Sequence, residues 1–497
     1  MTVVGFRSSI GTWGCAIGLI GLTLCWPAIT PVSPAVALAD EPAAAETPPD
    51  QPENDGSTET DSQETPSTGR TLEDAPTLER QVLTELESAP HWPARALAAI
   101  RLERFDCAPT RDRLIEFVQH DPDWRVRANA IRSLAERSIE QGEGWFEEEA
   151  EPRVIRTALR YGYEVDAGRV HRGVRFLLRS NRLDERLLGA EIAAASGKDD
   201  LVADATDTVR SVILRMDRAQ AGLLSPRLSA MTGVRGLFSR QDWMRWFREN
   251  GRRVELAETR RDPPNPHPPP AGERSFLAEL NVDAFARFES YVQQWPELRI
   301  DLVFALDCTG SMTPVFSRTQ SIISDTMLFL QDITESPRFG LVAFRDVDQE
   351  FVTRPFRLTQ DAEEIMLQTW LQEAVHGGRQ SESVLAALHD SYAMSWREHV
   401  ERLVILIGDG PPHRGEGGAC IRLAERARTR GGIRTQVVEP INAPVRDFKE
   451  IAEAGGGRLW TLDDYVLILA ELLGLERSDD IDQAFMAFIR HYTELLR

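Results

Sequence analysis

Hydrophobic and polar positions follow two different patterns along this chain. From about residue 77 to residue 250, apolar residues recur at three- and four-residue spacing with Arg or Glu between them, which predicts amphipathic helices. Beyond residue 300, short runs of apolar and partly β-branched residues alternate with helical segments. That second pattern is typical of buried parallel strands joined by crossover helices. The chain is therefore expected to have several domains, with an all-helical part followed by an α/β part.

The helical part contains related segments. They read PARALAAIRL at residues 93–102, WRVRANAIRSL at 124–134 and ERLLGAEIAAA at 185–195, and Ala99 and Ala130 occupy matching positions 31 residues apart. A repeat of this period resembles short HEAT-type repeats, which stack into an α-solenoid and offer an extended concave surface to other proteins. We assign residues 76–255 to this HEAT-like region, with an irregular helical bundle as the alternative.

The α/β part is expected to form a doubly wound, mostly parallel, Rossmann-like sheet, because strand and helix alternate with crossover lengths. Strands are predicted at residues 300–307, 339–345, 402–408, 433–439 and 458–461, with an edge strand at 350–358 that contains Pro355. Helices are predicted at residues 314–333, 361–373, 382–394, 419–430, 445–454, 464–473 and 481–496. The last two helices are expected to close one face of the sheet.

Two of the predicted strands end in an aspartate followed by a turn. Residues 302–312 read LVFALDCTGSM and residues 403–413 read LVILIGDGPPH, so Asp307 and Asp409 fall at the carboxyl edge of the sheet, where open α/β folds bind ligands. Thr309 and Ser311 add two hydroxyls in the turn after Asp307. Asp346 ends a third strand at the same edge, where a rim or water-mediated contact is expected. Such an oxygen-only set suits Mg²⁺, Mn²⁺ or Ca²⁺.

The Asp307-x-Thr309-x-Ser311 sequence resembles the metal-ion-dependent adhesion site of von Willebrand factor A domains, usually written D-x-S-x-S. The flanking segments GLVAFRD (340–346), ESVLAAL (382–388), IGDGPPH (407–413) and IAEAGGGRLWTLDD (451–464) fit the same family, and the resemblance covers residues 275–497. It implies a cation held by Asp307, Thr309, Ser311 and Asp409, directly or through water, and by an oxygen from a second loop. An acidic side chain of a partner protein would complete the coordination.

The second loop departs from the family pattern. It reads Gly-Gly-Arg-Gln-Ser-Glu over residues 377–382, without the usual Thr or Asp. Ser381 or Glu382 could supply the missing oxygen. Alternatively, Arg379 could place its guanidinium between Asp307 and Asp409 and replace the cation by a salt bridge. In this metal-free alternative the two aspartates only cap helices and hold loops.

The remaining segments bear on localisation. Residues 1–39 have the layout of a secretory signal peptide, with Arg7, an apolar run at 10–24 and the small-x-small site Ala37-Leu38-Ala39; an uncleaved membrane anchor is the alternative. Residues 40–75 form an acidic, Pro-, Glu- and Thr-rich spacer that is expected to be disordered, and residues 256–274 form a Pro-rich linker. We expect an exported bacterial protein, located in the periplasm or cell envelope or secreted. Buried Cys308 and Cys420 are expected as thiols, although a bridge between them is conceivable.

The formal net charge of −21 argues against nucleic acid as the main partner. No phosphate-binding loop and no catalytic Ser/His/Asp motif is visible in the sequence. We therefore expect a non-enzymatic adhesion or scaffold protein that binds a protein partner through its cation site, with the helical repeats as a second binding surface. Contact with a membrane is expected only if the signal peptide stays uncleaved. The alternatives are a structural envelope protein with a degenerate, metal-free A domain and a metal-dependent hydrolase or kinase-associated protein.

Overall fold

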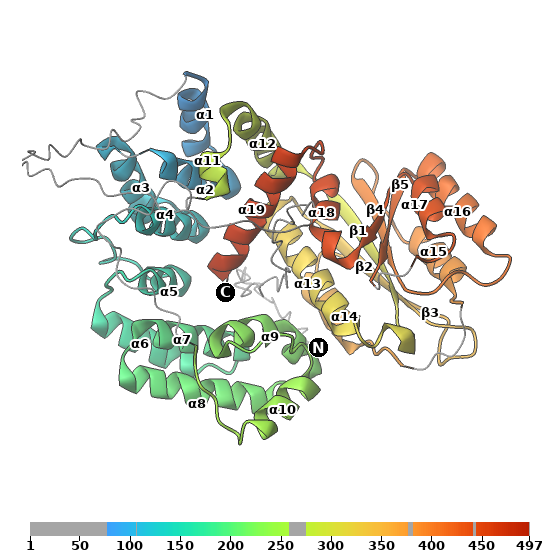
Figure 1. Ribbon diagram of the computed structural model, residues 1–497, viewed down its shortest axis with the longest axis horizontal. Coiled ribbons are helices and arrows are strands. Elements are labelled where there is room, and N and C mark those ends of the chain that lie inside the picture. The colour runs from blue at the N-terminus through green and yellow to red at the C-terminus, as the bar shows by residue number, and fades with distance from the viewer. Residues whose placement is uncertain (1–76, 106, 258–274, 376–380, 441–443, 497) are drawn as a thin grey trace, which may run out of the picture.

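The computed structural model describes residues 77–496 apart from residues 106, 258–274, 376–380 and 441–443 (Figure 1). The expected signal peptide and acidic spacer, most of the Pro-rich linker and Arg379 lie outside the described residues. No helix within the described ranges is both long and apolar enough to span a membrane.

The N-terminal part is a curved array of paired helices, which confirms the HEAT-like prediction (Figure 1). Its helices are α1 (Thr77–Glu87), α2 (Trp92–Arg101), α3 (Ala108–His120), α4 (Trp124–Glu136), α5 (Pro152–Arg160), α6 (Ala167–Leu178), α7 (Leu183–Ser196), α8 (Asp199–Arg215), α9 (Arg218–Thr232) and α10 (Arg240–Glu249). Side-chain caps start several of them: Asp123 caps α4, and Asp217 and Ser239 form capping boxes on α9 and α10. Contacts of α2 with α4, α4 with α5, and α5 with α7 make a continuous inner row.

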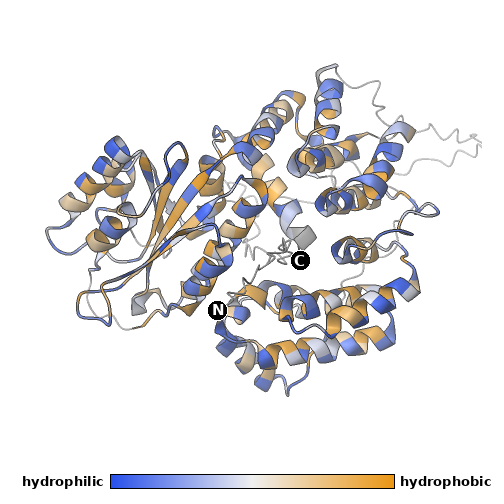
Figure 2. Ribbon diagram, turned by 180° about the vertical axis from the view of Figure 1, so that it is seen from behind, coloured by the Kyte–Doolittle hydropathy of each residue, from blue (hydrophilic) through white to orange (hydrophobic). Residues whose placement is uncertain are grey.

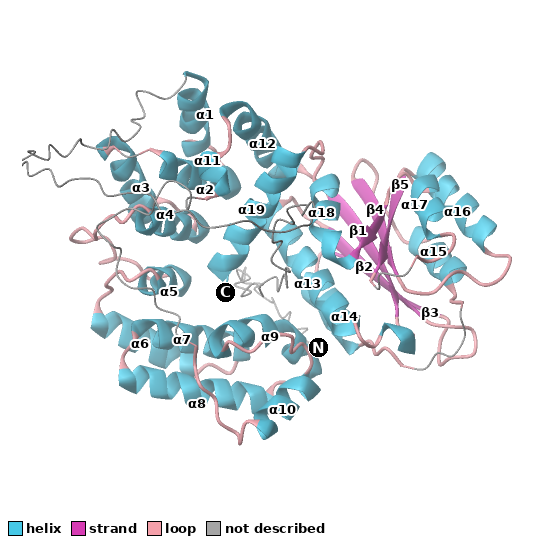
Figure 3. Cartoon of the chain, viewed as in Figure 1, coloured by secondary structure: helices cyan, strands magenta, loops and turns pink. Residues whose placement is uncertain are grey.

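The C-terminal part contains a six-stranded sheet in the order β3-β2-β1-β4-β5-β6, parallel except for edge strand β3 (Figure 3). The strands are β1 (Ile300–Asp307), β2 (Arg338–Phe344), β3 (Thr353–Thr359), β4 (Glu401–Ile407), β5 (Ile433–Glu439) and β6 (Leu459–Thr461). This arrangement confirms the doubly wound fold and the placement of Pro355 on an edge. Alternate residues of β1 point to opposite faces, as the period of two requires.

Helices cover both faces of the sheet. One face, with Leu302, Phe304 and Leu306, packs against α13 (Phe316–Ile333), α14 (Ala362–Leu371) and α18 (Tyr465–Leu472). The other face, with Val303 and Ala305, packs against α15 (Val384–Tyr392), α16 (Gly417–Gly431) and α17 (Phe448–Ala454). Cys308 belongs to the core of the first face and Cys420 to that of the second, and both are free, buried thiols.

Helices α11 (Phe276–Glu279), α12 (Val282–Gln294) and α19 (Asp479–Leu496) join the two parts. The helix predicted at residues 481–496, which is α19, is expected from the sequence to close a face of the sheet. The structure instead places it inside the helical array, where it contacts α4, α5, α11 and α12, while its Phe485 packs on Phe329 of α13 (Figure 1). Hydropathy colouring shows largely apolar strands in the sheet and mixed apolar and polar positions on the helices (Figure 2). One apolar core therefore runs from α1 through α19 to the sheet.

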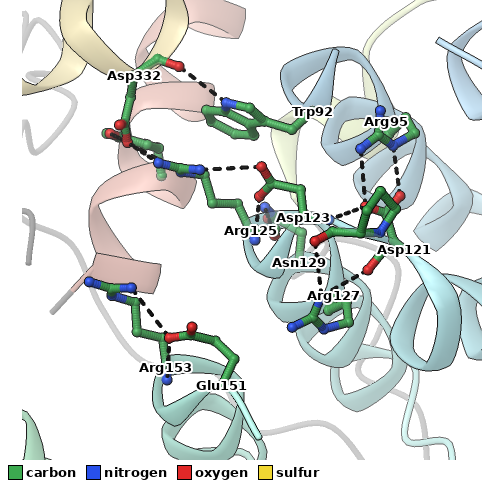
Figure 4. A network of polar contacts seen from close by, with 12 residues as sticks. Trp92, Arg95, Asp121, Asp123, Arg125, Arg127, Asn129, Glu151, Arg153 and Asp332 are labelled. Carbon is green, nitrogen blue, oxygen red and sulfur yellow. Dashed lines mark hydrogen bonds and ion pairs between the residues drawn. The ribbon is translucent and has the colours of Figure 1, made fainter. Parts of the chain in front are cut away.

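The helical array contacts the α/β part at two places. At the first, Asp332 near the end of α13 accepts hydrogen bonds from Trp92 Nε1 to its carbonyl (3.2 Å), and from Arg125 Nη2 (2.7 Å) and the Tyr492 hydroxyl (2.6 Å) to its carboxylate (Figure 4). At the second, α9 packs on α13 and α14. The two parts are thus packed against each other and are not independent domains joined only by a linker.

Candidate metal centre

The predicted site lies where β1 and β4 end side by side. Within the strand order the chain turns in opposite directions from these two strands, which makes this a topological switch point. Asp307 ends β1, and Asp409 follows β4 after Gly408. A Cβ built on Gly408 would lie 3.2 Å from Asp307 Oδ2, so a glycine at this position allows the two loops to approach closely.

The four residues predicted from the first and last motifs lie in one row of close polar contacts. Asp307 Oδ1 accepts hydrogen bonds from the Thr309 amide (2.9 Å) and from the Thr309 hydroxyl (2.8 Å). The Thr309 and Ser311 hydroxyl oxygens are 3.0 Å apart, and Ser311 Oγ donates to Asp409 Oδ1 at 2.9 Å. Asp307 and Thr309 are fully buried, whereas Ser311 is exposed. Side-chain oxygens from both motifs thus converge at one point of the sheet edge.

Of the two second-loop candidates, Glu382 lies among these carboxylates and Ser381 does not. The Glu382 amide donates to the Pro411 carbonyl at 2.8 Å, and Glu382 forms an isolated parallel bridge with Pro412. A Cβ on Gly410 would overlap the Glu382 side chain, which is 4% exposed. The loop after Asp409 is therefore built to receive this glutamate.

Asp346 and Ser381 meet at His413, beside the carboxylate cluster. His413 Nε2 is 3.1 Å from Asp346 Oδ1, and His413 Nδ1 is 3.0 Å from Ser381 Oγ. Ser383 Oγ lies 3.4 Å from Nε2. The contacts among these residues are not visible in the sequence, because the residues come from three separate loops. The only hint in the sequence is that each follows or precedes an element ending at the same edge.

The carboxylates repel one another in a buried setting. Burial, together with the charges of Asp307, Asp346 and Asp409, raises the pKa of Glu382 to about 8. Burial raises the pKa of Asp307 to about 7, and Asp409 contributes to this increase. Burial also raises the pKa of Asp409. Among the described residues, the charged groups that contribute most to the pKa values of Asp307 and Glu382 are carboxylates, as expected around a cation position.

Two buried oxygens of the site, Asp307 Oδ2 and Glu382 Oε2, have no hydrogen-bond partner within the described part of the chain. Buried polar atoms are normally satisfied, so these orphaned lone pairs call for a ligand. No three His, Cys, Asp or Glu side chains of the described residues gather tightly enough to hold a metal alone. The hydroxyls of Thr309 and Ser311 would have to complete the set, and oxygens of this kind fit Mg²⁺ or Mn²⁺.

A hollow of about 640 Å³ borders the site between α15 and α16. Ser383 and His413 form the wall nearest the carboxylates, and Val347, Leu385 and Leu423 give it an apolar lining. Val347, which directly follows Asp346, is 50% exposed. The edge that carries the carboxylates is thus open to a partner on this side.

Two family models match the chain. Residues 301–472 match the von Willebrand factor type A domain and residues 80–159 match HEAT repeats. No curated protein matches the chain.

Solved structures give distant likenesses. Two crystal forms of proximal thread matrix protein 1 from the mussel byssus are 13% and 14% identical, with TM-scores of 0.29 and 0.28, over 36% of this chain. The chain spans slightly under half of those proteins, 46% and 45%. An aerotolerance-related membrane protein from Bacteroides fragilis is 17% identical with a TM-score of 0.24, over 40% of this chain and 99% of that one. The family models, together with the strand order and the array of paired helices, show that this chain contains a von Willebrand factor type A (VWA) domain preceded by HEAT repeats.

Proposed function

We propose that this protein binds a partner protein through a divalent cation at the carboxyl edge of the VWA sheet. The observation that carries the proposal is the pair of buried oxygens Asp307 Oδ2 and Glu382 Oε2, which have no hydrogen-bond partner among the described residues and lie within a cluster of carboxylates. A cation such as Mg²⁺ or Mn²⁺ would neutralise this cluster. The residues that would hold it are Asp307, Thr309, Ser311, Asp409 and Glu382.

The expected partner group is an aspartate or glutamate side chain. Mg²⁺ retains exchangeable waters when a protein supplies only part of its ligand shell, so an incoming carboxylate can replace one of them. Ser311 is exposed and the neighbouring hollow is open, which gives a partner access to the site. Without a cation, the carboxylates of the cluster that remain ionised would repel the same carboxylate.

One observation favours an enzyme instead. Ser381, His413 and Asp346 lie in contact in the order that a nucleophile, a base and an orienting carboxylate require. We assign this network a positioning role, because Ser381 and Ser383 flank Glu382 and thus fix the loop that supplies it. A fluorophosphonate probe that labels the wild type but not Ser381→Ala would support a serine hydrolase; an unlabelled wild type agrees with a non-enzymatic protein.

The signal-like residues 1–39 support a place in a bacterial envelope or outside the cell. There the protein would act as an adhesion or scaffold component, with the HEAT repeats offering further surface to proteins. The net charge of −21 supports proteins rather than nucleic acids as partners.

The test is capture of envelope proteins by the immobilised full chain in Mg²⁺ or in EDTA. Capture that needs Mg²⁺, disappears in Asp307→Ala and persists in Asp447→Asn supports the proposal. Asp447 is a matched control because it lies in the loop region after β5, and Asn tolerates its left-handed backbone (φ 71°). Capture that is equal in EDTA and in Asp307→Ala would favour the metal-free alternative, including a salt bridge from Arg379.

A further inference from the structure

The last repeats of the helical array lie against the support of the metal-binding turn. We infer that α9 sets the cation affinity of the VWA site through residues 372–375, which we call the strap. This inference rests on the proposed function, since it concerns the regulation of the same site. It predicts that a change in the HEAT repeats alters cation binding without touching a ligand.

The first step is the contact between α9 and α14. Gly222 of α9 faces the indole of Trp370, and a Cβ added at Gly222 would overlap that ring. Trp370 is 2% exposed and donates through Nε1 to Ser324 Oγ of α13 at 2.9 Å. The indole is therefore fixed between α9 and α13, and α9 can lie this close only because residue 222 has no side chain.

The second step is the contact between α9 and the strap. Arg218, the first residue of α9, donates through Nη2 to the Gln372 carbonyl at 2.5 Å and forms an ion pair with Glu373. The same Gln372 carbonyl accepts a hydrogen bond from Gln320 Nε2 of α13 at 3.3 Å. The start of the strap is thus shared between the helical array and the VWA domain.

The third step is the contact between the strap and the metal-binding turn. The Val375 amide donates to the carbonyl of Cys308, which stands between Asp307 and Thr309, at 3.3 Å. The Thr313 hydroxyl, two residues beyond Ser311, donates to the Gly310 carbonyl at 2.7 Å and lies 3.5 Å from the Ala374 carbonyl. Arg345 Nη2 donates to the Glu373 carbonyl at 2.9 Å. The strap therefore holds the start of the turn that carries the first motif and lies beside its end.

The loss of residues that orient metal ligands without contacting the metal lowers metal affinity by roughly ten- to a hundredfold. Displacing α9 removes the Arg218 contact and the packing on Trp370, so the turn would lose part of its fixed geometry. By linkage, a bound cation must stabilise the α9–α14 contact by the same factor. A partner that binds the helical array and displaces α9 would thereby change the cation affinity of the VWA site.

The test compares Mn²⁺ affinity of the full chain in Gly222→Ala and Arg218→Ala with the wild type. Gly173→Ala is the matched control for the first variant, because a Cβ at Gly173 of α6 meets no atom within 4 Å. Arg210→Ala is the control for the second, since Arg210 forms an exposed ion pair with Asp207 within α8. We expect the Mn²⁺ Kd to rise about tenfold or more in both test variants and to stay unchanged in both controls.

Hydrogen exchange supplies a readout that a merely structural role would not move. Mn²⁺ should slow amide exchange in α9 of the wild type and leave it unchanged in Asp307→Ala. Unchanged Kd values in Gly222→Ala and Arg218→Ala would overturn the inference while leaving the proposed function standing. If Gly222→Ala fails to fold, Arg218→Ala decides alone, because its side chain is 38% exposed. A wild type that binds no Mn²⁺ would instead overturn the proposed function, and the inference with it.

Discussion

Buried carboxylates occur in this chain in two settings that differ in their neighbours. At the VWA site, the charged groups that act most on Asp307 and Glu382 within the described residues are other carboxylates, so an added cation would stabilise their charged forms. Glu103, on the helical side, is also buried, but it has Arg132 nearby and accepts a hydrogen bond from Ser133 Oγ at 2.8 Å. Burial outweighs these contacts and raises the pKa of Glu103 to about 7.

The raised pKa of Glu103 predicts a pH-dependent stability. A carboxyl whose pKa is higher in the folded than in the unfolded state stabilises the fold below its unfolded pKa, and this stability is lost as pH rises through about 7. Glu103→Gln removes the charge and keeps the shape. We expect the variant to exceed the wild type in free energy of unfolding by about 3 kcal/mol at pH 8 and to match it near pH 4. Urea denaturation at both values checks this, and an equal difference at the two pH values would contradict it.

At the residue scale, the sequence was sufficient to bring Asp307, Thr309, Ser311 and Asp409 together, because parallel strand ends share one edge of a sheet. It could not choose between Ser381 and Glu382. That choice depends on the fit of Glu382 against Gly410 and on the bond between the Glu382 amide and Pro411, which are contacts between distant loops.

At the scale of elements, periodicity located the strands and helices of the VWA domain closely but did not reveal their partners. The apolar positions of α19 predicted that it is buried, yet they did not show that its neighbours are the HEAT helices as well as α13. The hydrogen bonds to Asp332 could not be predicted from the sequence either. Asp332 and Arg125 are 207 residues apart in the chain.

The hydrogen bonds and the ion pair of Asp332 lead to a prediction about the contact between the two modules. Asp332→Ala leaves the partly buried Arg125 guanidinium, 17% exposed, with its longer contact to Asp123 and its cation–π contacts with Trp92 and Trp124. It also removes the acceptor of the Tyr492 hydroxyl. We expect the free energy of unfolding to fall by about 2–3 kcal/mol. Asp207→Ala, which breaks an exposed ion pair on α8, should change it by less than about 0.5 kcal/mol. Equal effects of the two variants in urea denaturation would show that the contacts of Asp332 do not contribute to the free energy of unfolding.

At the scale of the whole molecule, the HEAT and VWA modules share one apolar core. Phe485 of α19 is fully buried, with its ring 5.9 Å from that of Trp295, which follows α12, and 6.2 Å from that of Phe329 in α13. A shared core couples the unfolding of the parts that contribute to it. The shared core could not be predicted from the sequence, because a Pro-rich linker between two modules indicates separately folded domains.

The shared core predicts that one substitution loosens both modules. Phe485→Ala should lower the free energy of unfolding by about 3–5 kcal/mol, since it leaves a cavity in a close-packed core. Hydrogen exchange should accelerate in α2 and α4 as well as in α13. Phe176→Ala, at a position 76% exposed on α6, is the control and should leave exchange unchanged. Acceleration confined to the VWA helices would mean that the modules unfold independently.

The most direct test of cation-dependent binding is a titration of the purified full chain with Mn²⁺, followed by electron paramagnetic resonance, beside Asp307→Ala and Glu382→Gln. The site described here predicts one saturable Mn²⁺ per chain in the wild type, lost in Asp307→Ala and weakened in Glu382→Gln. It also predicts that Mg²⁺ displaces the bound Mn²⁺. A wild type that binds no Mn²⁺, or that binds it equally well after Asp307→Ala, would contradict a cation at this edge of the sheet.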